Sequence, residues 1–106
     1  MNLAQKPPLG LKDRTPKKDP RHLARVAELP CCICEAYGLV QIGRTYVHHT
    51  ICQRWSQEKV PDRETIPLCH LHHQGELGVH TDKTAWQQEF GSDRDWIAAT
   101  LDKLGA

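Results

Sequence analysis

A chain of 106 residues with 39% hydrophobic and only 6% aromatic residues is one small domain with a thin core, a composition that favours stabilisation by a metal ion or by cross-links. No stretch approaches the roughly 20 apolar residues that span a bilayer, and no secretory signal is visible, so we expect a cytoplasmic protein without membrane contact. Five cysteines are an odd number, which argues against a closed disulfide framework and favours metal or redox chemistry.

The net charge of +1 is distributed unevenly along the chain. Residues 1–25 carry seven Lys or Arg against two Asp, a net charge of +5, and the remainder carries −4. Residues 1–18 contain three prolines and little periodicity, so we expect a flexible basic arm there and one folded domain over 19–106. Such an arm suits a polyanionic partner such as nucleic acid, although a solvated tail without a partner is the alternative.

The first half of the domain predicts a helix, a turn and an extended segment. Asp19 followed by proline is typical of a helix start, and Pro30 would end that helix. We expect residues 31–34 to form a tight turn of the zinc-knuckle type and residues 37–49 to be extended. The polar stretch 50–64 lacks a clear period and predicts a loop.

The second half predicts a short strand and two helices. Residues 65–68 form an edge strand, because the proline within it cannot donate a ladder hydrogen bond. Thr81 is placed to cap a helix that ends at Gly91. Ser92 with Asp95 approximates a capping box for the last helix.

Two pairs of metal-ligand residues have the two-residue spacing that lets both members reach one ion. These are Cys31 with Cys34, and Cys69 with His72. A Cys₃His set favours a structural zinc, which would stabilise a chain with little core. Cys32 in place of Cys31 would form a less usual Cys-x-Cys pair, and redox cysteines or buried free thiols are the alternatives to a metal site.

The remaining histidines predict a second site. Histidine can bind a metal or act as a general base near neutral pH. His48 and His49 are adjacent on a predicted strand, so both serve one site only if the strand ends or bulges there. We interpret Cys52 as an ordinary thiol, and His22 and His70 as structural residues. The candidates for the second site are His48, His49, His73 and His80.

At these residues the chain resembles the HNH (ββα-metal, or His-Me finger) endonucleases. That family has a His-His or Asp-His pair ending one strand, then a loop, a second strand and a short helix with further metal-binding histidines. The stretch from Thr65 to Gly75, followed by Gly78-Val79-His80 and a helix with Trp86, is similar to phage recombination-enhancement (Ref) nucleases. The resemblance implies an α+β fold: a ββα-metal core with a zinc knuckle, flanking helices and the basic arm.

The resemblance also implies a role for each residue of the second site. His48, His73 and His80 would bind the catalytic metal, and His49 would be the general base. Mg²⁺ or Mn²⁺ would be the working ion, although imidazole ligands also favour Zn²⁺. The zinc held by the Cys₃His set would be structural.

The chain departs from the family pattern at two points. The middle asparagine that orients the base is absent, and its place falls near Glu64 or Thr65. His73 and His80 are seven residues apart, about 10 Å along an unbroken helix, which is too far for one ion. Glycines between them make an unbroken helix unfavourable, and Asp82 is the substitute ligand if His80 does not bind.

The resemblance implies a phage or prophage DNA endonuclease acting in the bacterial host cytoplasm, with a RecA filament as a candidate partner. Basic residues near the site and in the arm would contact phosphates without reading sequence. These candidates are Lys17, Lys18, Arg21, Arg44, Arg54, Lys59 and Arg63. The rival interpretation is a zinc-stabilised nucleic-acid- or protein-binding module whose nuclease centre is inactive.

Overall fold

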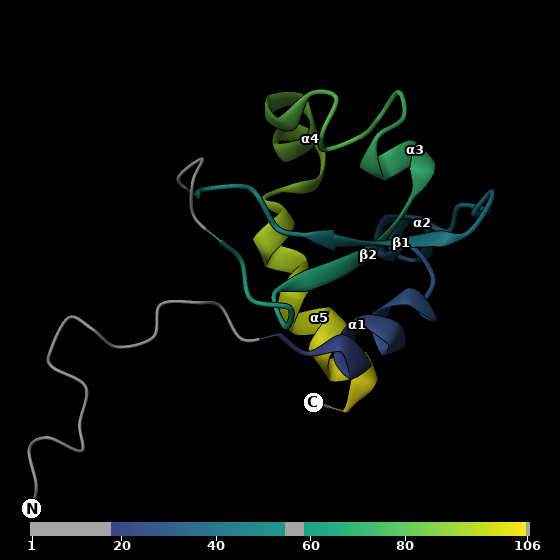
Figure 1. Ribbon diagram of the computed structural model, residues 1–106. Coiled ribbons are helices and arrows are strands. Elements are labelled where there is room, and N and C mark those ends of the chain that lie inside the picture. The colour runs from purple at the N-terminus through teal and green to yellow at the C-terminus, as the bar shows by residue number, and fades with distance from the viewer. Residues whose placement is uncertain (1–17, 55–58, 106) are drawn as a thin grey trace, which may run out of the picture.

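The computed structural model describes residues 18–54 and 59–105, and within them it shows a small α+β fold (Figure 1). Two strands form one antiparallel sheet, with α1 and the end of α5 on one side of it and α3 and α4 on the other. The elements in chain order are α1 (Pro20–Ala27), α2 (Cys32–Tyr37), β1 (Thr45–His49), β2 (Thr65–Cys69), α3 (His70–His73), α4 (Lys83–Phe90), the 3₁₀ helix η2 (Asp93–Trp96) and α5 (Ile97–Leu104).

Helix α1 begins where the sequence predicts. The Asp19 side chain accepts a hydrogen bond from the amide of His22 at 3.1 Å, and proline occupies the first helical position. Val26 and His22 are buried on the side that faces the sheet. Most of the predicted basic arm, residues 1–17, lies outside the described residues.

The segment after α1 differs from the prediction. Cys31 is the N-cap of a helix that continues to Tyr37, where we expected a tight turn and then extended chain. Gly38 ends this helix with a left-handed φ of 67°, and the amide of Leu39 bonds back to the carbonyl of Cys34. The strand therefore begins only at Thr45.

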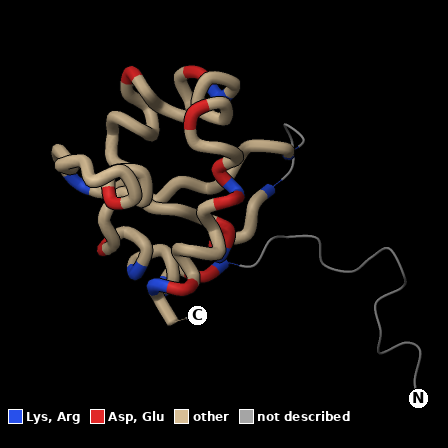
Figure 2. The backbone as a smooth tube through the Cα atoms, turned by 180° about the vertical axis from the view of Figure 1, so that it is seen from behind, with Lys and Arg blue, Asp and Glu red and all other residues tan. Residues whose placement is uncertain are grey.

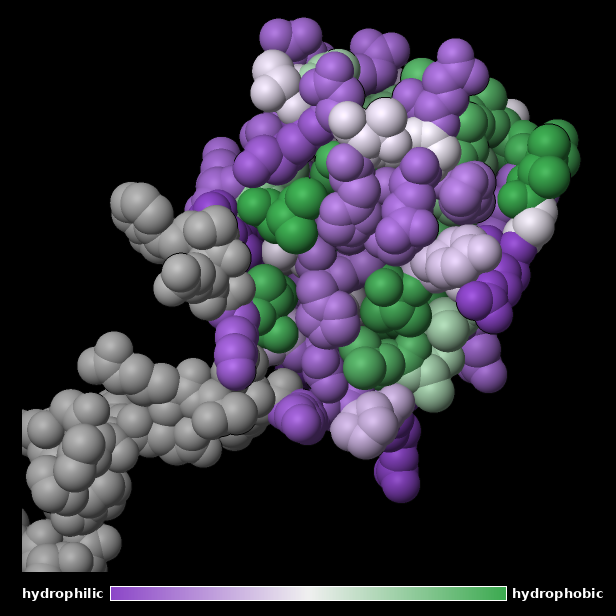
Figure 3. Space-filling model, turned by 45° about the horizontal axis from the view of Figure 1, so that its top comes forward, coloured by the Kyte–Doolittle hydropathy of each residue, from purple (hydrophilic) through white to green (hydrophobic). Residues whose placement is uncertain are grey.

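The apolar residues that suggested an extended segment lie in the loop after α2. Val40 is 87% exposed and Ile42 is 85% exposed, so these apolar side chains lie on the surface and do not belong to a buried strand. Figure 3 shows a hydrophobic projection at the right edge, on the side where Figure 1 places this loop.

The sheet carries residues of both predicted sites. In its register His48 lies opposite Ile66 and His49 opposite Thr65, while Pro67 pairs with Val47 at an edge. The predicted strand over 65–68 is confirmed and extends by one residue to Cys69. The described parts of the connection between the strands contain no helix or strand. β2 leads directly into α3, and so delivers the second ligand pair, Cys69 and His72.

The C-terminal helices follow the prediction with one correction. The Asp82 side chain, not that of Thr81, caps α4 by accepting from the amide of Ala85 at 3.0 Å. The Thr81 hydroxyl instead donates to carbonyls of the preceding turn. The capping box of Ser92 and Asp95 is confirmed, and it opens η2 before the chain continues as α5.

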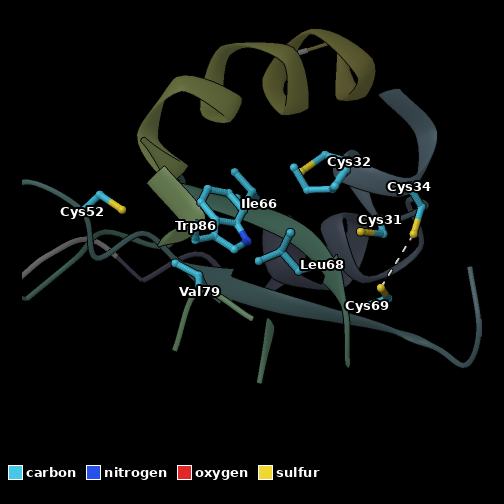
Figure 4. Close-up of a cluster of buried hydrophobic side chains, with 10 residues drawn as sticks. Cys31, Cys32, Cys34, Cys52, Ile66, Leu68, Cys69, Val79 and Trp86 are labelled. Carbon is cyan, nitrogen blue, oxygen red and sulfur yellow. Dashed lines mark hydrogen bonds between the residues drawn. The ribbon is translucent and has the colours of Figure 1, made fainter. Parts of the chain in front are cut away.

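The core is small and rich in sulfur. Figure 4 shows Ile66 and Leu68 on β2 between Trp86 and the cysteines of α2 and β2. Among the described residues no helix is long and apolar enough to cross a membrane.

Candidate metal centres

Three cysteines and one histidine converge in the buried interior. The Sγ atoms of Cys34 and Cys69 lie 3.7 Å apart. The Nδ1 atom of His72 lies 3.7 Å from Cys31 Sγ, 3.8 Å from Cys34 Sγ and 3.3 Å from Cys69 Sγ. In a tetrahedron with metal–sulfur bonds of about 2.3 Å, two sulfurs lie about 3.8 Å apart. The cluster could hold a metal ion, and its donors are those of a structural zinc site.

The other two cysteines lie outside this cluster. Figure 4 shows Cys32 directed away from the sulfurs of Cys31 and Cys34, and Cys52 on the far side of the core. Both are buried and unbridged. The structure thus groups Cys31 with Cys34, the pair with the usual spacing, and leaves Cys32 out.

The chemistry of the cluster fits a cation. Burial raises the pKa of the Cys34 thiol to about 12, and the neighbouring Cys31 and Cys69 add to that rise. Burial also lowers the pKa of His72, which favours the neutral imidazole that binds a metal. A divalent ion would neutralise the negative charge of the thiolates, which the buried environment otherwise disfavours.

Helices α2 and α4 fix this cluster from two sides. Cys31 and Cys34 come from the start of α2, where the amide of Cys31 donates to Gln41 Oε1 at 2.7 Å. From α4, Trp86 Nε1 donates to the carbonyl of His72 at 3.2 Å. Phe90 lies edge-on to the His72 ring at a centroid distance of 5.6 Å.

A second group contains three histidines from three parts of the chain. One ring nitrogen from each of His48, His73 and His80 lies within 4.8 Å of the others. The ring centroids are 4.8–5.1 Å apart, and each pair meets edge to face. His48 is buried, His73 is half-buried and His80 is exposed, so the group opens to solvent on one side.

The chain folds back after α3 to bring His80 to His73. The helix ends at His73, and the amide of His80 donates to the carbonyl of His73 at 3.0 Å. Gly78 allows this approach, because a Cβ atom there would lie 2.6 Å from the carbonyl oxygen of His73. The seven-residue spacing is therefore compatible with one site, while Asp82 caps α4 and is not part of the group.

A buried carboxylate orients the first of these histidines. Asp93 is fully buried at the start of η2, and its Oδ2 lies 2.7 Å from His48 Nε2. The carboxylate also accepts from the amides of Ile51 and Cys52. Burial by itself would raise the pKa of Asp93, but these hydrogen bonds outweigh it and the pKa lies below its ordinary value.

The bond to Asp93 leaves the other ring nitrogen of His48 unpartnered. His48 Nδ1 is buried and has no hydrogen-bond partner among the described residues. Burial, followed by the neighbouring histidines, lowers the pKa of His73 to about 4, so this imidazole is neutral at pH 7. A buried, unpaired lone pair beside neutral imidazoles fits a metal ligand held by an outer carboxylate.

Comparison with known families places the chain in one of them. A family model described as "Protein of unknown function (DUF968)" matches residues 11–105. The chain belongs to the DUF968 family. No curated protein and no solved structure matches this DUF968 chain.

His49, the predicted general base of the DUF968 chain, lies outside the three-histidine group and pairs with an aspartate instead. His49 is the last residue of β1, so the strand ends there without a bulge. Its Nε2 lies 2.9 Å from Asp62 Oδ1. The hydrogen bond with His49, together with one from the amide of Asp19, holds the pKa of Asp62 below its ordinary value.

Of the basic residues predicted to contact nucleic acid, three that the structure describes have separate partners within the fold. Arg44 stacks on the Tyr46 ring at 4.7 Å, Arg54 pairs with Glu64, and Arg63 lies 3.7 Å from Asp19. In Figure 2 a basic position lies next to acidic positions where the described chain begins. Of the remaining candidates, Lys17 lies outside the described residues, and the exposed ones are Lys18, Arg21 and Lys59.

Sequence reasoning missed two site residues, Asp62 and Asp93. Asp93 contacts a histidine 45 positions earlier in the chain, and neither aspartate stands at a ligand-like spacing. The one available signal for Asp93 was its place after Ser92 at a helix start, which indicates a cap rather than a contact to His48.

Proposed function

We propose that this DUF968 protein is a metal-dependent DNA endonuclease of the HNH type, with a structural zinc at the Cys₃His cluster. The observation that carries the proposal is the His48, His73 and His80 group, with the bare Nδ1 of His48 supported by Asp93. A protein that only binds DNA needs the cysteine cluster for stability but has no use for a second, solvent-facing histidine group.

The two-stranded sheet and α3 have the order that the ββα-metal core requires. β1 ends at the His48-His49 pair, β2 follows the polar connection, and α3 ends at His73. The three-histidine group would hold Mg²⁺ or Mn²⁺ and leave positions for water and a phosphate oxygen. The chemistry that such an ion supplies is stabilisation of negative charge on the phosphate and on the departing 3′-oxygen.

His49 supplies the proton transfer in this proposal. A neutral imidazole nitrogen takes a proton from water as the water oxygen bonds to phosphorus, and the bond from phosphorus to the 3′-oxygen breaks. The products are a 5′-phosphate and a 3′-alkoxide, which takes up a proton from solvent. General-base assistance of this kind typically contributes about 10²–10⁴-fold to the rate.

The proposal that the substrate is DNA is supported by the charge distribution and by the family resemblance. Residues 1–25 carry a net charge of +5, which suits the phosphate backbone. The scattered basic residues of the described domain favour binding without sequence specificity. The likeness to Ref nucleases extends the proposal to a phage recombination enzyme that cuts DNA within a RecA filament.

The experiment compares wild type, His49→Ala and His70→Ala in cleavage of supercoiled plasmid, single-stranded DNA and RNA with Mg²⁺ or Mn²⁺. A RecA filament is added in a parallel series, and zinc content and circular dichroism are measured for each protein. His70 is the matched control, because it is an exposed histidine of α3 that belongs to neither ligand group.

We expect wild type and His70→Ala to cleave DNA, and His49→Ala to lose cleavage while it keeps its zinc and its fold.

One feature favours the rival binding module: regular alternation along β1 directs His48 and His49 to opposite faces of the sheet. DNA binding by wild type without cleavage of any substrate would establish that rival.

A further inference from the structure

Asp62 occupies a position that the proposed mechanism leaves vacant. HNH-type enzymes orient the base with an asparagine, and the single asparagine of this chain is Asn2, within the arm. The structure instead places Asp62 Oδ1 at 2.9 Å from His49 Nε2. The His49 side chain is 42% exposed and that of Asp62 is 15% exposed, so the carboxylate lies beneath an imidazole that solvent can reach.

The Asp62 carboxylate is fixed on both of its oxygens. Its Oδ2 accepts from the backbone amide of Asp19 at 2.7 Å, at the start of α1. The turn that contains Asp62 is closed by a hydrogen bond from the amide of Glu64 to the carbonyl of Pro61 at 3.0 Å. The Thr65 hydroxyl donates to the Asp62 carbonyl at 2.8 Å. Oδ2 of Asp62 therefore accepts from a backbone amide, and Oδ1 is available to accept from His49.

This arrangement determines where His49 carries its proton. An ionised carboxylate only accepts hydrogen bonds, so the ring nitrogen that faces it must be the N–H. The proton is then on Nε2, and Nδ1 has a free lone pair. Among the described residues Asp62 is the one hydrogen-bond partner of the His49 ring.

We propose that Asp62 is the positioning residue of His49, and that Nδ1 of His49 is the atom that takes the proton from the attacking water. The proposal rests on the proposed function, because it assumes that His49 is the base. The water proton moves to Nδ1 while the Nε2 proton stays in its hydrogen bond to Asp62. The positive charge that develops on the ring lies against the carboxylate.

The bond to Asp19 makes substitution of Asp62 by asparagine informative. The amide of Asp19 can only donate, so it requires the oxygen of the new side chain. The NH₂ group must then face His49 Nε2, which would have to accept and move its proton to Nδ1. The base nitrogen would be blocked, as happens when the aspartate of a Ser-His-Asp triad is replaced by asparagine. Alanine imposes no tautomer.

The test measures kcat and KM for DNA cleavage by the zinc-loaded protein with Mg²⁺ for wild type, Asp62→Asn, Asp62→Ala and Asp19→Ala. We expect Asp62→Asn to lower kcat about 10²–10⁴-fold with little change in KM, and Asp62→Ala to lower it less. Asp19→Ala is the matched control: it removes the α1 cap but keeps the backbone N–H that contacts Asp62.

A purely structural role for Asp62 predicts the opposite order. Asparagine preserves more of the contacts to α1 than alanine does, so it would be the milder change, and Asp19→Ala would lower activity as much as either. Either result would overturn the proposal.

Nitrogen NMR of the His49 ring at alkaline pH provides a readout that does not need activity. We expect an N–H on Nε2 in wild type and on Nδ1 in Asp62→Asn. Wild-type protein with the proton on Nδ1 would refute the role of Asp62. The expected tautomers in a protein that cleaves nothing would instead refute the proposed function and leave the Asp62–His49 contact in place.

Discussion

At the scale of single residues, the histidine group depends on Asp93, which contacts His48 but is not a member of the group. Asp93 holds the proton of His48 on Nε2 and so leaves the Nδ1 lone pair free, on a ring that lies about 5 Å from the rings of His73 and His80. An outer carboxylate of this kind fixes the ring orientation and increases the basicity of the ligand nitrogen.

Asp93→Asn should therefore weaken metal binding at the histidine group by about 10–100-fold, the usual effect of losing such a partner. The zinc at the Cys₃His cluster should remain, because Asp93 contacts none of its ligands. Titration with Mn²⁺ after zinc loading measures the first effect, and zinc stoichiometry measures the second. The exposed Asp102→Asn variant is the control for charge. Unchanged Mn²⁺ affinity in folded Asp93→Asn would show that the carboxylate does not orient His48.

At the scale of elements, the turn after α3 brings His73 and His80 into one group, although they are seven residues apart and would be too distant on a continuous helix. The amides of Val79 and His80 donate to the carbonyls of His72 and His73, and so both of these α3 histidines are tied to the chain that follows. Gly78 lies at the closest approach of the two segments, against the His73 carbonyl.

Gly78→Ala should separate these segments and disable the histidine group. The added Cβ would meet backbone atoms of His73 and Gln74 at 2.6–2.8 Å, so relief requires movement of the turn that carries His80. Overpacking of this kind typically costs about 1–3 kcal/mol of stability. Urea unfolding measures that loss, and Mn²⁺ titration the loss of the site. Gly105→Ala, at a positive φ with open space around it, is the control. Normal Mn²⁺ affinity in Gly78→Ala would show that the fold-back is not needed.

The elements also show what the sequence could and could not reveal. Local signals worked: Asp19 with proline marked the start of α1, and Ser92 with Asp95 marked the start of η2. The segment after Cys31 was misjudged because the apolar Val40 and Ile42 suggest a strand, yet they lie exposed in a loop. The ligand groups were visible through their spacing, whereas Asp62 and Asp93 were not, because their contacts depend on how distant segments pack.

At the scale of the whole molecule, the Cys₃His cluster connects most of the fold. Its ligands come from α2, the end of β2 and α3, and α4 packs over His72 through Trp86 and Phe90. The hydrophobic core around it contains few large aliphatic side chains, chiefly Ile33, Ile66 and Leu68. Without a bound ion, the cluster would leave unpaired buried sulfur atoms in the centre of that core.

Loss of zinc should therefore unfold the protein rather than only weaken one site. Structural zinc binding in small domains contributes about 10–16 kcal/mol, which is as large as the total stability of a typical domain, about 5–15 kcal/mol. Chelation, or the substitution Cys69→Ser, should abolish the cooperative thermal transition and the helical circular dichroism signal. Cys52→Ser is the matched control, because Cys52 is a fully buried thiol outside the cluster. We expect it to lower the unfolding temperature by a few degrees at most while zinc stays bound. A folded, zinc-free Cys69→Ser protein would mean that the apolar contacts of the sheet and helices suffice, and that the cluster has another role.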